Sequence, residues 1–273
     1  GAGLAWAIDN VITAYEKIGK LPRAPQATPV SITLGSAANL MEVEDKSVTA
    51  VVVDSPYADN VQYSELADFF YVWLKRTQGH RRPEWFSTYL CEHDQEAVVN
   101  VSRHRTDSKS AKEARQEAHV FYQELMTDTF REAHRVLRDD GVLTVMFTHK
   151  KQEAWASLFE SLVQAGFTIT ATWPIRTESR HSLNQARKNA AQSTVLLVAS
   201  KRENGGRRSR MKRQLGYYDQ AMRDEIRAVA RTAAARLKGG GLTAIDQLVG
   251  AFGPAMEVYS RYDEVRTDTG ERV

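Results

Sequence analysis

Cysteine is nearly absent from this chain of 273 residues, in which Cys91 is the only one. One cysteine excludes a disulfide bond within the chain and a zinc site built from several thiolates, so we expect no metal site. A low cysteine content also fits a reducing compartment, and we expect the protein to be cytoplasmic.

Long apolar runs are also absent. None approaches the roughly 18 residues that would indicate a membrane span, so we expect no association with a membrane. The sequence starts without a methionine and without the basic region of a signal peptide. Such a start is expected of an artificial boundary or of an internal fragment of a longer protein.

A large excess of one charge is lacking, because 37 basic residues stand against 34 acidic ones and leave a net charge of +3. The basic residues are nevertheless unevenly distributed. Seven of them lie within residues 201–213, and Arg176, Arg180, Arg187 and Lys188 form a second group. Either group can neutralise the phosphates of a nucleic acid, and a solvated loop is the alternative for each.

The spacing of apolar residues predicts three regions. Residues 1–24 indicate an amphipathic helix, at residues 5–20, and a proline-containing linker. Residues 25–202 contain strands and helices, interrupted by a polar insertion at residues 80–112 that we expect to be a long loop. Residues 203–273 begin with a basic linker and continue as a helical C-terminal region.

Strands are expected at residues 31–34, 48–54, 142–147, 167–173 and 193–200, and helices at residues 64–75, 113–138 and 152–165. This order predicts an α/β fold with a mostly parallel, doubly wound sheet and an antiparallel final pair. The helix at residues 113–138 is expected to stop at Asp139-Asp140-Gly141. In the C-terminal region, helices are expected at residues 218–237, 243–252 and 254–262.

The expected helix at residues 64–75 is rich in aromatic side chains, namely Phe69, Phe70, Tyr71 and Trp73. We expect them to lie in the core. A platform on which nucleic-acid bases stack is the alternative.

The most informative stretch is Val51-Val52-Val53-Asp54-Ser55-Pro56-Tyr57. Its apolar run predicts a buried parallel strand. The four residues that follow the run would then lie at the carboxyl end of the strand, where open α/β sheets place their ligands.

The chemistry of these four residues suits an exocyclic amino group. The amino nitrogen of adenine is a poor nucleophile, because its lone pair is delocalised into the ring. Two acceptors for its hydrogens favour a more tetrahedral nitrogen, and the Asp54 side chain and the Ser55 carbonyl can supply them. Pro56 restricts Ser55 to an extended conformation, which helps to aim that carbonyl. Tyr57 can stack on a base turned out of the duplex.

At these residues the chain resembles the amino-methyltransferases of DNA, whose signature is Asp/Asn/Ser-Pro-Pro-Tyr/Phe/Trp. The run from Asp54 to Arg76 is similar to the large adenine-specific DNA methylases of bacteria and archaea, which carry a zinc ribbon and often neighbour phage-defence genes. Residues 148–155, 165–175 and 250–259 also agree with this family. The resemblance implies a Rossmann-like sheet that transfers a methyl group from S-adenosylmethionine to N6 of adenine in DNA, in phage defence or restriction–modification.

The resemblance also assigns residues to roles. Catalysis would fall to Asp54, Ser55, Pro56 and Tyr57, and S-adenosylmethionine would be bound by Gly35, Ser36, Ala37 and Asp54. DNA would contact Tyr57, Asn60, Tyr63, Arg176 and Arg180. From the residues alone, turn and capping roles are equally open for Asp59, Asn60 and Tyr63, and His149 either faces the site or is a structural histidine.

Three departures from the family pattern stand out. Ser55 replaces the usual proline, and Ser36 replaces an acidic residue that often contacts the adenine of the cofactor. The glycine loop of the type Asp-Pro-Phe-x-Gly-x-Gly, which lets the backbone approach the cofactor, is missing from the sequence. The chain therefore resembles the C-terminal part of such a methylase. Its sheet would be incomplete unless an upstream segment or a partner chain supplies two strands and completes the cofactor site.

The leading expectation is thus a DNA adenine-N6 methyltransferase. One alternative is a catalytically incomplete or degenerate module that binds DNA or a partner chain. Another is an amino-methyltransferase that acts on N4 of cytosine or on RNA, because these enzymes share the motif chemistry.

Overall fold

The computed structural model describes residues 3–21, 30–33, 35–149, 151–175, 194–202, 215–239, 244–262, 264–271 and 273. The chain divides into two units, residues 1–35 and residues 36–273. The first unit contains α1 (Leu4–Gly19), which confirms the helix expected there. The apolar residues Ile8, Val11 and Ile12 of α1 are all exposed.

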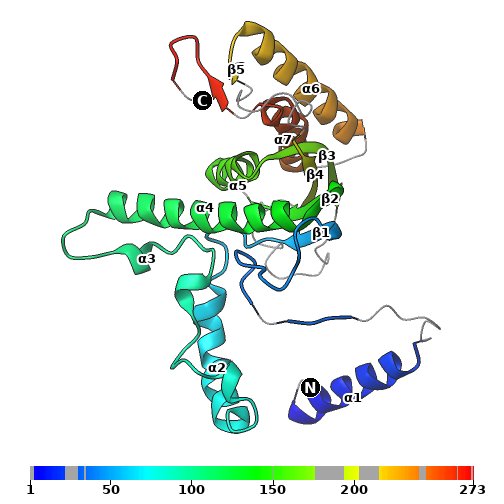
Figure 1. The fold of residues 1–273 in the computed structure, drawn as a ribbon, viewed down its shortest axis with the longest axis vertical. Helices are drawn as coiled ribbons and strands as arrows, with labels where there is room; N and C mark the ends of the chain where they lie inside the picture. The colour runs from blue at the N-terminus through cyan, green and yellow to red at the C-terminus, as the bar shows by residue number, and fades with distance from the viewer. Residues whose placement is uncertain are drawn as a thin grey trace. The chain divides into compact units, whose positions relative to one another are not determined.

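The second unit is built on a sheet of four described strands in the order β1-β2-β4-β3 (Figure 1). The strands are β1 (Val48–Asp54), β2 (Leu137–Phe147), β3 (Phe167–Ile175) and β4 (Thr194–Lys201). β1 and β2 are parallel, whereas β4 is antiparallel to both of its neighbours. The α/β fold and the antiparallel final pair are confirmed. The described sheet is mixed and not mostly parallel, because β4 enters between β2 and β3.

β1 lies at one edge of this sheet, and among the described strands it pairs only with β2. Val51 and Val53 pack against the core, whereas Val52 on the opposite face is 76 % exposed. The prediction of a parallel strand is therefore confirmed. The prediction that it is buried is wrong within the described residues, because they cover only one face of β1.

The strand expected at residues 31–34 is not formed by residues 31–33, and Leu34 lies outside the described residues. Ile32 is 92 % exposed. An isolated extended segment is not stable by itself, and no described strand pairs with this one.

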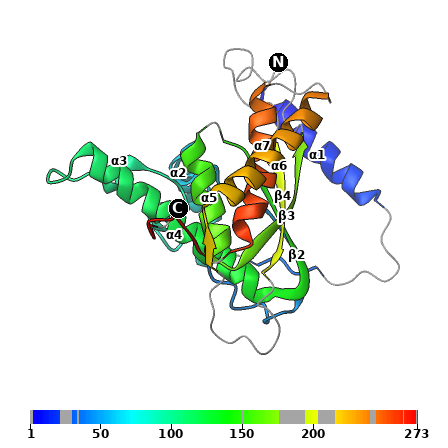
Figure 2. The ribbon, with the colours of Figure 1, turned by 90° about the horizontal axis from the view of Figure 1, so that it is seen from above.

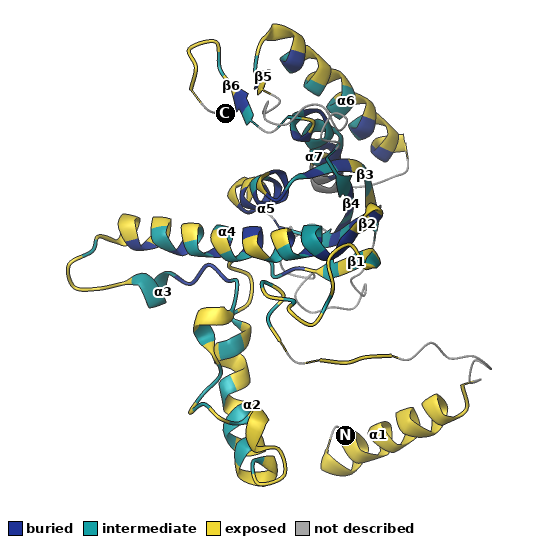
Figure 3. Cartoon of the chain, in the orientation of Figure 1, coloured by how far each residue is buried: buried dark blue, intermediate teal, exposed yellow. Residues whose placement is uncertain are grey.

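One face of the sheet is covered by helices that include α4 (Ala111–Val136) and α5 (Gln152–Gln164), which lie side by side in Figures 1 and 2. Large buried side chains from both layers form the core, among them Tyr122, Phe130, Phe147, Leu158 and Leu197. Figure 3 shows buried positions in dark blue along α4, α5 and the strands of the sheet. The helices therefore hold β1 and β2 in place through apolar packing.

The junction between α4 and β2 differs from the prediction. The strand begins at Leu137, directly after the helix, so Asp139-Asp140-Gly141 lies inside β2 and does not terminate α4. A Cβ atom on Gly141 would lie 2.9 Å from the carbonyl oxygen of Thr49. The glycine thus permits a close approach of β1 and β2.

The C-terminal region is helical, as expected, with α6 (Gln220–Gly239) and α7 (Ala244–Ser260). α7 continues through Pro254, where two shorter helices were predicted. A Cβ atom on Gly253 would lie 1.8 Å from Cγ2 of Thr172, so the middle of α7 is pressed directly against β3. A short parallel pair, β5 (Leu215–Tyr217) and β6 (Glu264–Arg266), was not predicted.

The helix expected at residues 64–75 is α2 (Tyr63–Gln78). The predicted insertion contains the short helices η1 (Pro83–Trp85), η2 (His93–Gln95) and α3 (Val101–His104). The prediction that the aromatic residues of α2 lie in the core is wrong for Phe69, Phe70 and Trp73, which are 66 %, 64 % and 55 % exposed. The physical reason is that α2 packs through its polar side.

Candidate functional site

The residues of the motif emerge at the carboxyl end of β1, as the sequence predicted. Asp54, Ser55, Pro56 and Tyr57 line a small open hollow together with Tyr63, the first residue of α2. Its volume is about 130 Å³. Ligand pockets typically measure roughly 300–1,000 Å³, so these residues can hold one reacting group but do not enclose a whole cofactor.

Asp54 and Tyr57 contact each other directly. The hydroxyl of Tyr57 donates a hydrogen bond to Oδ1 of Asp54 over 2.8 Å. The ring of Tyr57 packs edge to face on Phe147, with centroids 5.5 Å apart. The carboxylate of Asp54 is thus oriented by the side chain of Tyr57, whose ring is held in place by Phe147 of the core.

The backbone of the motif is held by buried partners on other elements. Tyr122 of α4 is fully buried, and its hydroxyl donates to the carbonyl of Pro56 over 3.0 Å. Burial raises the pKa of Tyr122 well above its ordinary value, so the hydroxyl stays protonated and remains a donor. The hydroxyl of Ser55 points toward the carbonyl of Met146 at 3.4 Å. Such support fixes the loop before any ligand arrives.

The next residues continue this ordered turn. Ala58 has a φ of 49° and is 2 % exposed, and its carbonyl accepts the N–H of Val99 over 3.2 Å. The N–H of Asn60 donates to the carbonyl of Tyr57 over 3.0 Å. Asn60 therefore supports the turn through its backbone, and its side chain does not line the hollow.

His149 lies beneath the turn and not in the hollow. Its side chain is fully buried, Nε2 is 3.0 Å from Oδ1 of Asp59, and Nδ1 accepts the N–H of Lys151 over 3.1 Å. Because Nδ1 accepts, Nε2 carries the proton and donates to Asp59. Burial lowers the pKa of His149 and keeps it neutral. This geometry corresponds to the structural alternative for His149.

Asp59 also bonds the ammonium of Lys151. Burial by itself would raise the pKa of Asp59, but the hydrogen bonds and charges of Lys151 and His149 outweigh it, and the pKa lies below its ordinary value. Asp59 is thus a charged anchor between the motif turn and the segment after β2. Sequence reasoning had left this residue open between a pocket role and a turn role.

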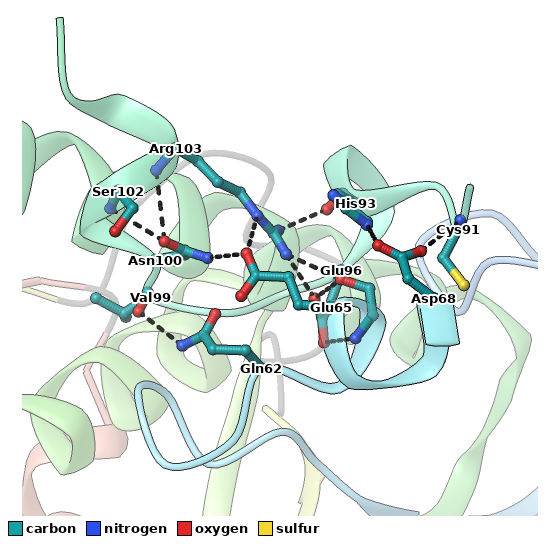
Figure 4. A network of polar contacts seen from close by, with 11 residues as sticks. Gln62, Glu65, Asp68, Cys91, His93, Glu96, Val99, Asn100, Ser102 and Arg103 are labelled. Carbon is teal, nitrogen blue, oxygen red and sulfur yellow. Dashed lines mark hydrogen bonds and ion pairs between the residues drawn. The ribbon is translucent and has the colours of Figure 1, made fainter. Parts of the chain in front are cut away.

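Tyr63 is positioned by a polar network that joins the start of α2 to residues 91–103 (Figure 4). At its centre, the guanidinium of Arg103 donates to the hydroxyl of Ser64 over 2.9 Å and pairs with Glu96 at 3.1 Å. The N–H of Ser64 donates to Glu96 over 3.0 Å. The first turn of α2, and with it Tyr63, is thereby fixed beside the motif.

The same network continues along α2 toward its middle. Asn100 donates to Glu65 over 2.6 Å and accepts the N–H of Ser102 over 3.0 Å, which caps α3. Further on, Asp68 accepts the N–H of Cys91 over 2.9 Å and lies 2.8 Å from Nε2 of His93. The insertion is therefore largely an ordered polar partner of α2 and not one long irregular loop.

Of the four residues expected to bind the cofactor, Asp54 lines the hollow, whereas Gly35, Ser36 and Ala37 are not among its lining residues. Gly35 belongs to the first unit, and Ser36 forms a local turn in which its carbonyl accepts the N–H of Asn39 over 3.0 Å. The chain after Ala37 is fastened to the end of α4, where Arg135 donates to the carbonyl of Leu40 over 2.8 Å. That attachment lies near the amino end of β1, whereas Asp54 is at its carboxyl end. Binding of S-adenosylmethionine by these residues stays a prediction.

The predicted phosphate-binding residues Arg176, Arg180, Arg187 and Lys188 lie outside the described residues, as does most of the basic stretch at 201–213. Among the residues that are described, no group of three or more potential ligands is arranged to hold a metal ion. Within the same residues, no helix is both long and apolar enough to cross a membrane.

Sequence reasoning missed Tyr122, Phe147 and Lys151 as supports of the motif. Only Tyr122 carries a signal, because a tyrosine on the apolar face of a helix must find a partner for its hydroxyl once buried. No family model matches the chain, and no curated protein matches it either.

Proposed function

We propose that this chain provides the target-base half of an S-adenosylmethionine-dependent methyltransferase that acts on N6 of adenine in DNA. The observation that carries the proposal is the hollow at the carboxyl end of β1, where Asp54 and the Ser55 backbone lie beside the aromatic side chains of Tyr57 and Tyr63. A carboxylate, a carbonyl and two aromatic rings are the groups needed to hold an amino-substituted base.

In this proposal Asp54 and the Ser55 carbonyl accept the two hydrogens of the adenine amino group and align its nitrogen. Tyr57 orients the carboxylate through the hydrogen bond to Oδ1, and Tyr57 and Tyr63 offer ring surface to an extruded base. Stacking of this kind is worth roughly 1–3 kcal/mol per base. S-adenosylmethionine, when bound, supplies a methyl group already activated by the sulfonium.

The small volume of the hollow and the position of Ser36 favour a cofactor site that is completed by other strands. The outer edge of β1 pairs with no other described strand, which leaves backbone donors and acceptors for an added one. We propose that an upstream segment or a partner chain occupies this edge in a Rossmann-like sheet, in a cytoplasmic phage-defence or restriction–modification system.

A binding module without catalysis is the second candidate. It is favoured by Ser36, which can offer only a neutral hydrogen bond to a cofactor. The retained carboxylate of Asp54 speaks against it. The proposed roles of the residues would be the same if the enzyme acted on N4 of cytosine or on RNA instead of adenine in DNA.

Two readouts test the proposal. Extrusion of a base by this chain is followed by the fluorescence of 2-aminopurine in DNA. Transfer is followed by incorporation of a labelled methyl group after the upstream segment or partner chain has completed the sheet. We expect Asp54→Ala to abolish transfer and to leave the circular dichroism spectrum unchanged. Asp140→Ala is the matched control, because Asp140 is exposed on β2 and bonds Arg138.

Transfer at an undiminished rate in Asp54→Ala would refute the role of Asp54. Base extrusion without transfer, once the upstream segment or partner chain completes the sheet, would identify the binding module. Absence of base extrusion by this chain would refute the proposal, because the target-base half is proposed to hold the base by itself.

A further inference from the structure

Helix α2 packs against the rest of the protein through its polar side, whereas an amphipathic helix usually buries its apolar side. Its polar side chains Ser64, Asp68 and Lys75 are engaged with residues 88–96, whereas its apolar side faces outward. Figure 3 shows α2 with exposed and half-buried positions, and none of its residues is buried. An apolar face left out of the core marks an interaction surface.

The exposed face forms a continuous stripe. Its large side chains are 50–66 % exposed and recur three and four residues apart, as a helix-packing surface requires: Leu66, Phe69, Phe70, Trp73 and Leu74. We call these five residues the α2 stripe. An aromatic side chain can bury about 150–250 Å². Five large side chains thus offer area on the order of the ~800 Å² per partner found in specific interfaces.

The charges beside the α2 stripe argue for a protein and against a nucleic acid. Glu65 lies in the first turn of α2, and Lys75 and Arg76 lie in its last turn. Lys75 already donates to the carbonyl of Thr88, and Arg76 covers the ring of Trp73 at 5.4 Å. The helix therefore lacks the excess of free positive charge that tracks a phosphate backbone.

We propose that the α2 stripe is a dimer interface that binds the α2 stripe of a second copy of this chain, with the two helices antiparallel. In that orientation Glu65 in the first turn of one helix meets Arg76 in the last turn of the other, and the helix dipoles are opposed favourably. A parallel arrangement would place like charges together. The interface is isologous, as expected for a two-fold dimer.

The test is sedimentation equilibrium of the complete chain across a range of concentrations. We expect a dimer, and we expect Phe70→Glu to raise its dissociation constant at least tenfold, because it places a charge at the centre of the α2 stripe. Val120→Glu is the matched control, since Val120 is an exposed apolar residue of α4 outside the stripe. Ile12→Glu gives the same control for the exposed face of α1.

Cysteine pairing tests the orientation after Cys91→Ser removes the only native thiol. Ala67→Cys and Leu74→Cys chains, mixed and mildly oxidised, should give mainly the mixed disulfide dimer. A monomeric chain, or a dimer unchanged by Phe70→Glu, would overturn the interface. Preferential Ala67→Cys homodimers would overturn the antiparallel orientation. If Phe70→Glu weakened binding to DNA without changing the mass, the stripe would be a nucleic-acid surface instead.

Discussion

The hydroxyl of Tyr57 donates to Oδ1 of Asp54 over 2.8 Å, and both residues line the hollow formed by the motif. This contact joins the residue expected to stack on a base with the residue expected to bind its amino group. The aromatic position of the motif therefore has a second role, which is to orient the carboxylate.

Tyr57→Phe separates these two roles. The ring remains, so binding of a base should change little, whereas the carboxylate loses a charge-assisted hydrogen bond worth roughly 1.5–3 kcal/mol. We expect methyl transfer to fall about tenfold or more while the 2-aminopurine signal persists. Tyr57→Ala should lower both methyl transfer and the 2-aminopurine signal. Equal losses of both readouts in Tyr57→Phe would show that the hydrogen bond does not act separately.

Tyr122→Phe tests the support of the motif backbone. The substitution keeps the buried ring but leaves the carbonyl of Pro56 without its donor at 3.0 Å. Loss of a buried hydrogen bond of this kind costs about 1–3 kcal/mol, which urea unfolding can measure. Tyr89→Phe is the control, because Tyr89 is 87 % exposed and its removal should leave the free energy of unfolding unchanged.

His149 makes stability depend on pH. Burial lowers its pKa below the usual 6.5, so the unfolded chain binds a proton on this residue at a pH where the folded chain does not. Stability is therefore full above about pH 6.5 and falls as the pH decreases toward the folded pKa, by at most ~1.4 kcal/mol per pH unit. His134 contributes in the same direction, because burial also lowers its pKa.

Replacement of His149 by Gln should flatten this dependence between pH 5 and pH 7, the range in which an ordinary histidine titrates. Urea unfolding at several pH values measures the slope. Asp59 acts only in a lower range, since its lowered pKa contributes stability that is lost below its ordinary value of 3.8. If the free energy of unfolding of His149→Gln depends on pH as steeply as that of the unmodified chain, the effect belongs to His134.

Gly253→Ala tests the contact between α7 and β3. The added Cβ would meet Cγ2 of Thr172 at 1.8 Å, so α7 must move away from the sheet. Overpacking of this kind typically costs about 1–3 kcal/mol, to be measured by thermal or urea unfolding. Gly239→Ala provides the control, because a Cβ there meets nothing within 4 Å. Thr172→Ala should restore part of the loss if the clash is its cause.

The secondary structure of the second unit could be predicted largely because it depends on local spacing. The run at Val51-Val52-Val53 indicated β1, and the helical spacing of residues 113–138 indicated α4. Gly166, with a φ of 87°, follows the end of α5. These features require no knowledge of which segments meet.

The support of the site could not be predicted in the same way. Tyr122 lies 66 residues from Pro56, and Lys151 lies 92 residues from Asp59. No local pattern in the sequence predicts that these groups are in contact. The contacts depend on how α4 and β2 pack against the motif turn.

By itself, the sequence determined the elements and the chemistry of Asp54 to Tyr57, since periodicity and residue type are local properties. Only the tertiary structure decided that β4 enters antiparallel between β2 and β3, that His149 is enclosed under the turn, and that the aromatic side of α2 faces outward. These outcomes depend on which surfaces bury one another. Residues 88–103 offer α2 so many hydrogen-bond partners that its polar side, and not its apolar side, is the one that packs.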